Sequence, residues 1–199
     1  GLGLTMLPPD VNHSDFMFVA TDARTVRYGL GAVKGVGQGV CESIVEARRG
    51  DGTSSRQGPF ADLLDFCKRV DSSKLNKRAL EALINAGALD ALGRNRASLA
   101  LQLPEVLKAI DQISKNRSAG IVDMFGSSSG GDDIHVDLPE TDEWPLTQLL
   151  HGERETLGHY LSGHPMDPYR EDLRSLVGND LGNLDAIWAN QSPGEKKGW

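Results

Sequence analysis

The residues with the clearest chemical potential form a short glycine-rich turn that precedes a helix-like segment. In Val33-Lys34-Gly35-Val36-Gly37-Gln38-Gly39-Val40, two glycines flank one apolar residue. Gly35 and Gly37 permit a tight turn with positive φ and leave no side-chain wall, and Val36 is expected to point into the core. The backbone N–H groups of such a turn and of the following helix are exposed together and can hold a phosphate oxygen. The stretch therefore predicts a site that contacts a nucleic-acid backbone and not its bases.

The candidate DNA-contacting residues fall into two groups. The first group is the turn itself. The second group is a set of basic residues expected on the polar face of a later helix, where they either contact phosphates or simply form a solvated basic surface. The candidates are Lys34, Gly35, Val36, Gly37, Gln38 and Gly39 in the turn, and Lys74, Lys77 and Arg78 on the later helix. A second, weaker version of the turn occurs at residues 83–89, where Gly87 matches the first glycine and is interpreted mainly as a helix stop.

The first turn resembles the helix-hairpin-helix DNA-binding motif. In that motif Gly-apolar-Gly is followed by a few polar residues, a small residue and paired aliphatics, for which this chain has Cys41, Ile44 and Val45. The position two residues after the second glycine is often Lys in that family, and here it is Gly39. The resemblance therefore implies that Lys34 and the backbone amides carry more of the phosphate binding. A plain corner between two helices is the alternative interpretation.

Charge and composition narrow the class of protein. The net charge is −7, which argues against a uniformly basic nucleic-acid binder, but residues 24–96 hold 13 Lys and Arg against 8 Asp and Glu, and residues 127–199 hold 5 against 14. This asymmetry is compatible with a DNA-contacting module joined to a non-contacting region, and equally with chance.

The two cysteines and the absence of a signal peptide or an 18-residue apolar run indicate a cytoplasmic protein with buried thiols. The histidines show no metal-ligand spacing, and the chain starts without Met, so we expect a piece of a longer protein.

The periodicity predicts a mainly α fold with a small N-terminal β-hairpin and a flexible loop before the C-terminal helices. The motif resemblance implies that the helices between them form a tandem helix-hairpin-helix domain. Ser72 or Ser73, and Asn95, are expected to cap helices, and Gly87 to end one. Pro104 is expected either to kink a helix or to start one, and Asp167-Pro168 to open the last helix. The expected strands are 16–20 and 25–28, and the expected helices are 39–49, 60–70, 73–86, 95–103 with a continuation to 113, 153–162 and 167–177. The expected domains are an N-terminal segment with the β-hairpin at 1–28, the tandem hairpin domain at 29–117, the loop at 118–146 and the C-terminal helices at 147–178. For residues 179–199, the family resemblance described next implies the lead-in to a further OB-fold-like domain.

Several short segments, read in order, make the chain similar to one family over nearly its whole length. They are Leu7-Pro8-Pro9-Asp10, Tyr28-Gly29-Leu30-Gly31, Leu75-Asn76-Lys77-Arg78, Gly87-Ala88-Leu89-Asp90, Asp123-Met124-Phe125-Gly126, Glu153-Arg154-Glu155-Thr156-Leu157-Gly158 and Gly163-His164-Pro165. Together they resemble the alpha (catalytic) subunits of bacterial DNA polymerase III, in the region of the tandem helix-hairpin-helix and clamp-binding domain.

The resemblance implies a fragment of a replicative DNA polymerase that binds duplex DNA without sequence specificity and docks on the sliding clamp. The implied clamp-binding residues are Ile121, Val122, Asp123, Met124 and Phe125, with Ile121 where the family has Gln. Other replicase subunits are implied partners, and the parent polymerase is expected to use Mg²⁺, although no catalytic residue, metal site or cofactor is expected in this fragment and no membrane association. The alternatives are a tandem hairpin module of a DNA-repair nuclease and a non-enzymatic protein-binding adaptor.

Overall fold

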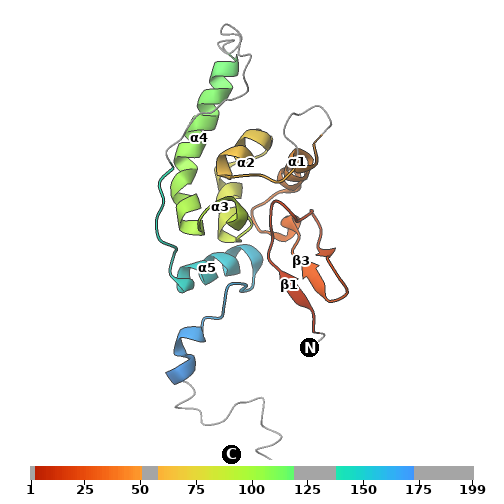
Figure 1. Ribbon diagram of the computed structural model, residues 1–199, viewed down its shortest axis with the longest axis vertical. Coiled ribbons are helices and arrows are strands. Elements are labelled where there is room, and N and C mark those ends of the chain that lie inside the picture. The colour runs from red at the N-terminus through yellow and green to blue at the C-terminus, as the bar shows by residue number, and fades with distance from the viewer. Residues whose placement is uncertain (1–2, 51–57, 119–137, 173–199) are drawn as a thin grey trace, which may run out of the picture. The chain divides into compact units, whose positions relative to one another are not determined.

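The computed structural model in Figure 1 describes residues 3–50, 58–118 and 138–172. The chain divides into two compact units, Gly1–Ser162 and Gly163–Trp199. The first unit contains the strands β1 (Thr5–Leu7), β2 (Val19–Ala20) and β3 (Thr25–Arg27), the helices α1 (Gln38–Arg49), α2 (Leu63–Arg69), α3 (Lys77–Asn85), α4 (Arg96–Ser118) and α5 (Leu146–Leu157), and the 3₁₀ turns η1 (Leu30–Ala32) and η2 (Asp90–Leu92). The prediction of a mainly α fold with a small N-terminal β element is confirmed.

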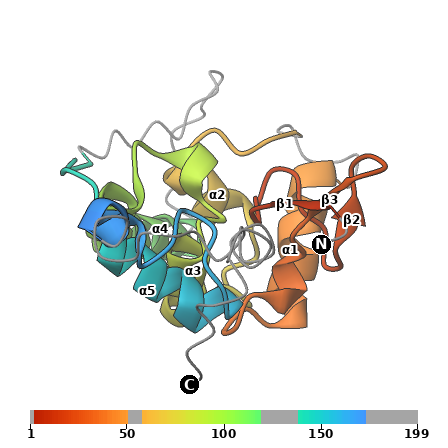
Figure 2. The same cartoon turned by 90° about the horizontal axis from the view of Figure 1, so that it is seen from below.

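The small sheet has the strand order β1-β3-β2. The predicted hairpin corresponds to β2 and β3, which pair antiparallel, but β1 adds a parallel strand on the other side of β3 that the sequence did not indicate. Phe16 lies outside the sheet, because the carbonyls of Asp15 and Phe16 accept hydrogen bonds from the N–H groups of Leu30 and Gly31 in the η1 turn. Figure 2 shows the strands beside α1, on the opposite side of the unit from α4 and α5.

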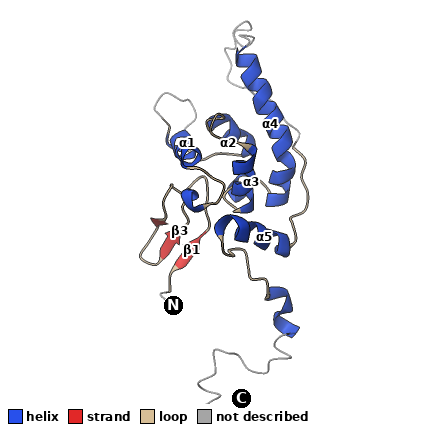
Figure 3. Ribbon diagram, turned by 180° about the vertical axis from the view of Figure 1, so that it is seen from behind, coloured by secondary structure: helices blue, strands red, loops and turns tan. Residues whose placement is uncertain are grey.

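The helices enclose one apolar core in which α3 is central. Helix α3 packs against both α4 and α5, and α2 packs against α4; Figure 3 shows this helical part and the strands as separate regions. Apolar residues on α3 recur at the spacing of one helical face, which explains why a short helix is stable there. The largest fully buried apolar side chains are Phe66, Leu30, Ile44, Leu63, Leu80, Leu83, Ile84, Leu89, Leu99, Leu103 and Val11.

The ends of α3 are set by local hydrogen bonds. Its N-cap is Asn76, whose side chain accepts from the Ala79 N–H, so the prediction of a Ser72 or Ser73 cap was wrong. Ser73 instead donates its N–H and hydroxyl to the carboxylate of Asp71 in the preceding turn.

At the other end of α3 the glycine stop is confirmed. Gly87 has φ +75°, and the N–H groups of Gly87 and Ala88 donate to the carbonyls of Ile84 and Leu83, which is the Schellman arrangement.

The boundaries of α2 and α4 differ in detail from those expected. Helix α2 begins at Leu63, three residues into the predicted segment, because Asp62 accepts from the Asp65 N–H as its N-cap. Asn95 caps α4 by accepting from the Ser98 N–H, as predicted. Helix α4 then continues to Ser118 with Pro104 inside it, so Pro104 does not start a new helix.

The predicted helix 153–162 was misplaced. Helix α5 begins at Leu146, directly after Pro145, and ends at Gly158, which adopts φ +82°. The chain then turns so that the N–H groups of Leu161 and Ser162 donate to the carboxylate of Glu153. The Glu153 side chain is fully buried.

In the second unit the described residues are Gly163–Asp172. The 3₁₀ turn η4 (Asp167–Tyr169) has Pro168 in its first turn, and helical backbone continues through Asp172. Asp167 is not the N-cap of this turn, which is Met166. The Asp167 carboxylate instead accepts a hydrogen bond from the preceding His164 N–H and pairs with Arg170. The remainder of the predicted helix to residue 177 lies outside the described residues. Within the described ranges, no helix combines the length and the apolar character needed to cross a membrane.

Candidate nucleic-acid interface

The first hairpin is a tight turn whose central residue is anchored in the core. Val36 is buried, with 7% of its surface exposed, as expected. Gly35 adopts φ +93°, a conformation that favours glycine. Gly37, however, has φ −77° and ψ 160° as the N-cap of α1, so only the first glycine of the pair is required by a positive φ.

The exposed backbone amides of this turn point to an anion-binding role. Within the described part of the chain, no acceptor is found for the N–H groups of Gly35, Gly37, Gln38 and Gly39. The Lys34 N–H is used internally, because it donates to the Thr156 carbonyl over 2.8 Å. Unsatisfied amides at the amino end of a helix, together with the helix dipole, favour a negatively charged ligand.

Two helices hold the turn in place. A Cβ at Gly35 would lie 3.3 Å from the Ala82 side chain of α3, so the turn packs closely on that helix. The end of α5 contributes the Thr156 carbonyl to Lys34 and the Leu157 carbonyl to the Tyr28 hydroxyl, which donates over 3.2 Å. The amides are therefore presented on a rigid frame.

The predicted basic residues take different positions around the turn. Lys34 is exposed, and no ion pair involves it in the described residues. Arg78 is exposed on α3, one helical turn before Ala82, the residue that touches the hairpin. Lys77 lies on the same helix but pairs with Glu81 at 3.6 Å.

Lys74 is not on a helix, contrary to the prediction. It belongs to the turn before α3, and its Cδ lies 3.7 Å from the place that a Cβ on Gly39 would occupy. Its ammonium is 3.9 Å from the Asp71 carboxylate. The structure thus brings Lys74 beside the amino end of α1, which no local pattern in the sequence indicated.

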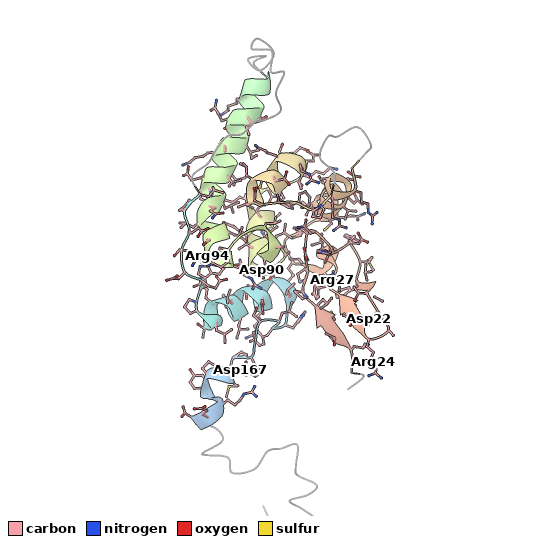
Figure 4. The ribbon with its side chains drawn as sticks, in the orientation of Figure 1. Asp22, Arg24, Arg27, Asp90, Arg94 and Asp167 are labelled. Atoms are coloured by element: carbon pink, nitrogen blue, oxygen red, sulfur yellow. The ribbon has the colours of Figure 1, made fainter. Side chains whose placement is uncertain are left out.

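The second hairpin, between α3 and α4, is filled by an internal cluster of charges. The Arg96 guanidinium packs against Gly87 and donates to Asp90 and, over 3.0 Å, to Glu153. Asp90, labelled in Figure 4, lies where α3, α4 and α5 meet. These groups bind one another, so the second hairpin is occupied by side chains of the chain itself.

Burial and hydrogen bonding act differently on the two carboxylates of this cluster. Burial raises the pKa of Asp90 above its ordinary value, although Arg96 opposes the shift. Burial alone would also raise the pKa of Glu153, but hydrogen bonds from Ser162, Leu161 and Arg96 outweigh it and leave that pKa below its ordinary value. Glu153 is therefore ionised and fully engaged at neutral pH, which suits structural support and not proton transfer.

The predicted clamp-binding residues Ile121, Val122, Asp123, Met124 and Phe125 lie outside the described residues. Among the residues that are described, no group of three His, Cys, Asp or Glu side chains is placed to hold a metal ion.

Residues 3–99, just under half of the chain, match the family described as "Helix-hairpin-helix motif". The full-length comparison is more specific. The chain is 56% identical over its whole length to DNA polymerase III subunit alpha of Xylella fastidiosa (strain Temecula1), 43% identical over 96% of its length to that of Vibrio cholerae, and 43% identical over 89% of its length to that of Escherichia coli K12. The chain is thus homologous to a segment of DNA polymerase III subunit alpha, and it spans 15–16% of the length of these relatives.

Proposed function

We propose that this chain binds the phosphate backbone of duplex DNA through its first hairpin, as part of a replicative DNA polymerase. The observation that carries the proposal is a group of four amides, those of Gly35, Gly37, Gln38 and Gly39, for which the described residues provide no acceptor. They lie on a turn that is anchored by Val36 and flanked by Lys34, Lys74 and Arg78. Amides and cations that contact phosphates read no bases, so binding should be independent of sequence.

The test replaces Gly37 with valine. The backbone at Gly37 is compatible with any L residue, and a Cβ there would meet nothing within 4 Å. Gly37→Val should therefore fold normally while its side chain stands in front of the exposed amides. We expect weaker binding to unrelated duplexes, measured by fluorescence anisotropy, and a salt slope reduced by about one phosphate contact.

Two controls decide the meaning of that result. Thermal melts should show a folded Gly37→Val that is less stable by only about 1 kcal/mol, since glycine is preferred to valine at an N-cap although it contributes no side-chain bond. Equal duplex binding by wild type and Gly37→Val at low salt, with both proteins folded, would remove the hairpin from the DNA interface and contradict the proposal.

The polymerase activity belongs to a longer protein in this proposal. The similarity to DNA polymerase III subunit alpha over the whole chain supports a DNA-directed DNA polymerase over a repair nuclease. The Mg²⁺ of such an enzyme would be held by carboxylates outside these residues, because Glu153 is saturated by internal donors and Asp90 is paired with the Arg96 guanidinium.

Sliding-clamp docking through residues 121–125 is a second part of the proposal, and contacts with other replicase subunits are a third. The support for clamp docking is the sequence Asp123-Met124-Phe125, an apolar pair of the kind that enters a preformed pocket. Phe125→Ala should abolish binding of the cognate clamp and leave duplex binding intact, and Ile121→Gln should strengthen clamp binding. A titration of the clamp against both variants checks this, and clamp binding unchanged by Phe125→Ala would contradict it.

Capture of a protein partner with no salt-dependent duplex binding would instead favour the adaptor alternative.

A further inference from the structure

We propose that Lys74 supplies a phosphate-binding cation to the amino end of α1, and that Asp71 is the partner that a DNA phosphate replaces. This inference rests on the proposed DNA-backbone binding, in which Lys74 flanks the turn, and it adds the place where that lysine acts and the partner that it exchanges. The argument depends on how the turn formed by residues 71–74 is attached to α1.

The turn touches α1 at two points on one helical face. The Asp71 N–H donates to the Ser43 Oγ over 2.9 Å, and Ser43 is buried, with 4% of its surface exposed. Gly39 lies one helical turn before Ser43, and residues four apart share a helix face. The Lys74 Cδ is in van der Waals reach of Gly39, at 3.7 Å from the place of its Cβ. The aliphatic stem of Lys74 therefore runs alongside this position of α1, where a Cβ would make only an ordinary van der Waals contact with it.

Hydrogen bonds inside the turn fix the backbone from which this lysine projects. The Asp71 carboxylate accepts from the Ser73 N–H and hydroxyl at 2.9 and 2.7 Å. The N–H groups of Lys74 and Leu75 donate to the Asp71 carbonyl. Lys74 is therefore held at α1 by a structured turn, and its position does not depend on a freely moving loop.

The electrostatics of this place favour an anion between the lysine and the helix. The amino end of a helix carries a partial positive charge, so a nearby ammonium is unfavourable unless a negative group lies close to both. In the structure the carboxylate paired with Lys74 is that of Asp71, 3.9 Å from the Lys74 Nζ, and both side chains are more than two-fifths exposed. So long and so exposed an ion pair contributes little, and a phosphate bound to the amides at residues 37–39 can take over the ammonium.

The first experiment removes the charge and keeps the stem. Lys74→Gln is compared with wild type and with Lys108→Gln, a matched control in which the lost lysine also belongs to an exposed i,i+3 ion pair but lies on α4. Duplex affinity is measured by fluorescence anisotropy at about 50 and 200 mM salt. Loss of one phosphate contact reduces the steepness of the plot of log K against log salt by about 0.9. The ratio of the duplex association constants of wild type and Lys74→Gln should therefore be about 3.5-fold larger at the lower salt concentration than at the higher. Lys108→Gln should follow wild type.

The second experiment tests the exchange of partners. Asp71→Asn removes the competing charge and keeps the backbone N–H that donates to Ser43. It should strengthen duplex binding several-fold, and this gain should disappear in the Lys74→Gln background, because the two residues act as one unit. A gain that persists without Lys74 would reflect net charge alone and would overturn the exchange.

The outcomes separate this inference from the function on which it rests. If wild type shows no salt-dependent duplex binding, the proposed function itself fails. If wild type binds and Lys74→Gln behaves like Lys108→Gln, with the same melting temperature, the proposed function stands and the role of Lys74 is refuted.

Discussion

Replacement of Glu153 by glutamine should destabilise the protein far more than its sequence position on an amphipathic helix suggests. The side chain is fully buried, and it accepts from the Leu161 and Ser162 N–H groups, the Ser162 hydroxyl and the Arg96 guanidinium. A carboxylate offers two acceptor oxygens, whereas an amide offers one and presents an NH₂ group to the donors on its other side. Glu153→Gln therefore leaves at least one buried donor unsatisfied and deprives Arg96 of one of its two carboxylate partners.

The magnitude follows from the number of partners that remain. Breaking a buried ion pair by removing one member costs about 3–5 kcal/mol. Arg96 keeps Asp90, to which its Nε and Nη2 donate, so the lower end of that range, about 3 kcal/mol, is expected. For a chain of this length, such a loss lowers Tm by roughly 6–12 °C.

The pH dependence gives a second signature. Because the pKa of Glu153 in the folded state lies below its value in the unfolded chain, its contribution is fully present above the unfolded pKa of about 4.3 and is lost as pH falls through the folded pKa. The glutamine of the variant does not titrate. The difference in unfolding free energy between wild type and Glu153→Gln should therefore be largest at neutral pH and should shrink below about pH 4.

Urea unfolding monitored by circular dichroism at neutral pH measures this difference. Glu155→Gln is the matched control, since Glu155 is exposed on the same helix and its replacement should change the unfolding free energy by less than about 0.5 kcal/mol. If the two variants were equally stable, or if the difference did not depend on pH, the assignment of Glu153 as a buried, ionised support would be refuted.

Two further predictions concern glycines and thiols. Gly87→Ala should lower the free energy of unfolding by about 3 kcal/mol in urea, and Gly158→Ala by only about 1–2 kcal/mol. Both glycines have positive φ, but only at Gly87 would the new methyl group collide with Arg96. Equal losses of stability in the two variants would contradict the packing of that guanidinium on Gly87. Burial raises the pKa of Cys41 to about 11 and that of Cys67 to about 12, so a thiol reagent at about pH 8 should react with them only in denaturant, and rapid labelling of the native protein would contradict their burial.

The elements that sequence reasoning placed well are those whose ends depend on neighbouring residues. Asn95 and Gly87 act through hydrogen bonds within a few positions, so a local pattern was sufficient. Helix α5 was misplaced because Glu153 stands at an inward-facing position between Leu150 and Leu157, where an apolar residue would have extended the 3.6-residue pattern. The charge is tolerated there only because Arg96, far away in the sequence, is its partner.

The candidate interface divides in the same way. The Gly-Val-Gly spacing predicted a turn with a buried central residue before α1, but it could not tell which glycine takes the positive φ, since either position satisfies the pattern. The position of Lys74 beside Gly39 depends on a tertiary contact between the 71–74 turn and Ser43. A one-dimensional pattern carries no information about that contact.

The support of the first hairpin by α5 has a consequence for the order of folding. The Tyr28 hydroxyl and its acceptor, the Leu157 carbonyl, are 129 residues apart in the chain. At a synthesis rate of about 5–20 residues per second, roughly 6–26 s pass between translation of the two. Throughout that interval the nascent hairpin lacks the α5 contacts, so final locking of the turn is a late event that must await a distant segment. Contacts of such long range also raise the entropic cost of loop closure and slow folding.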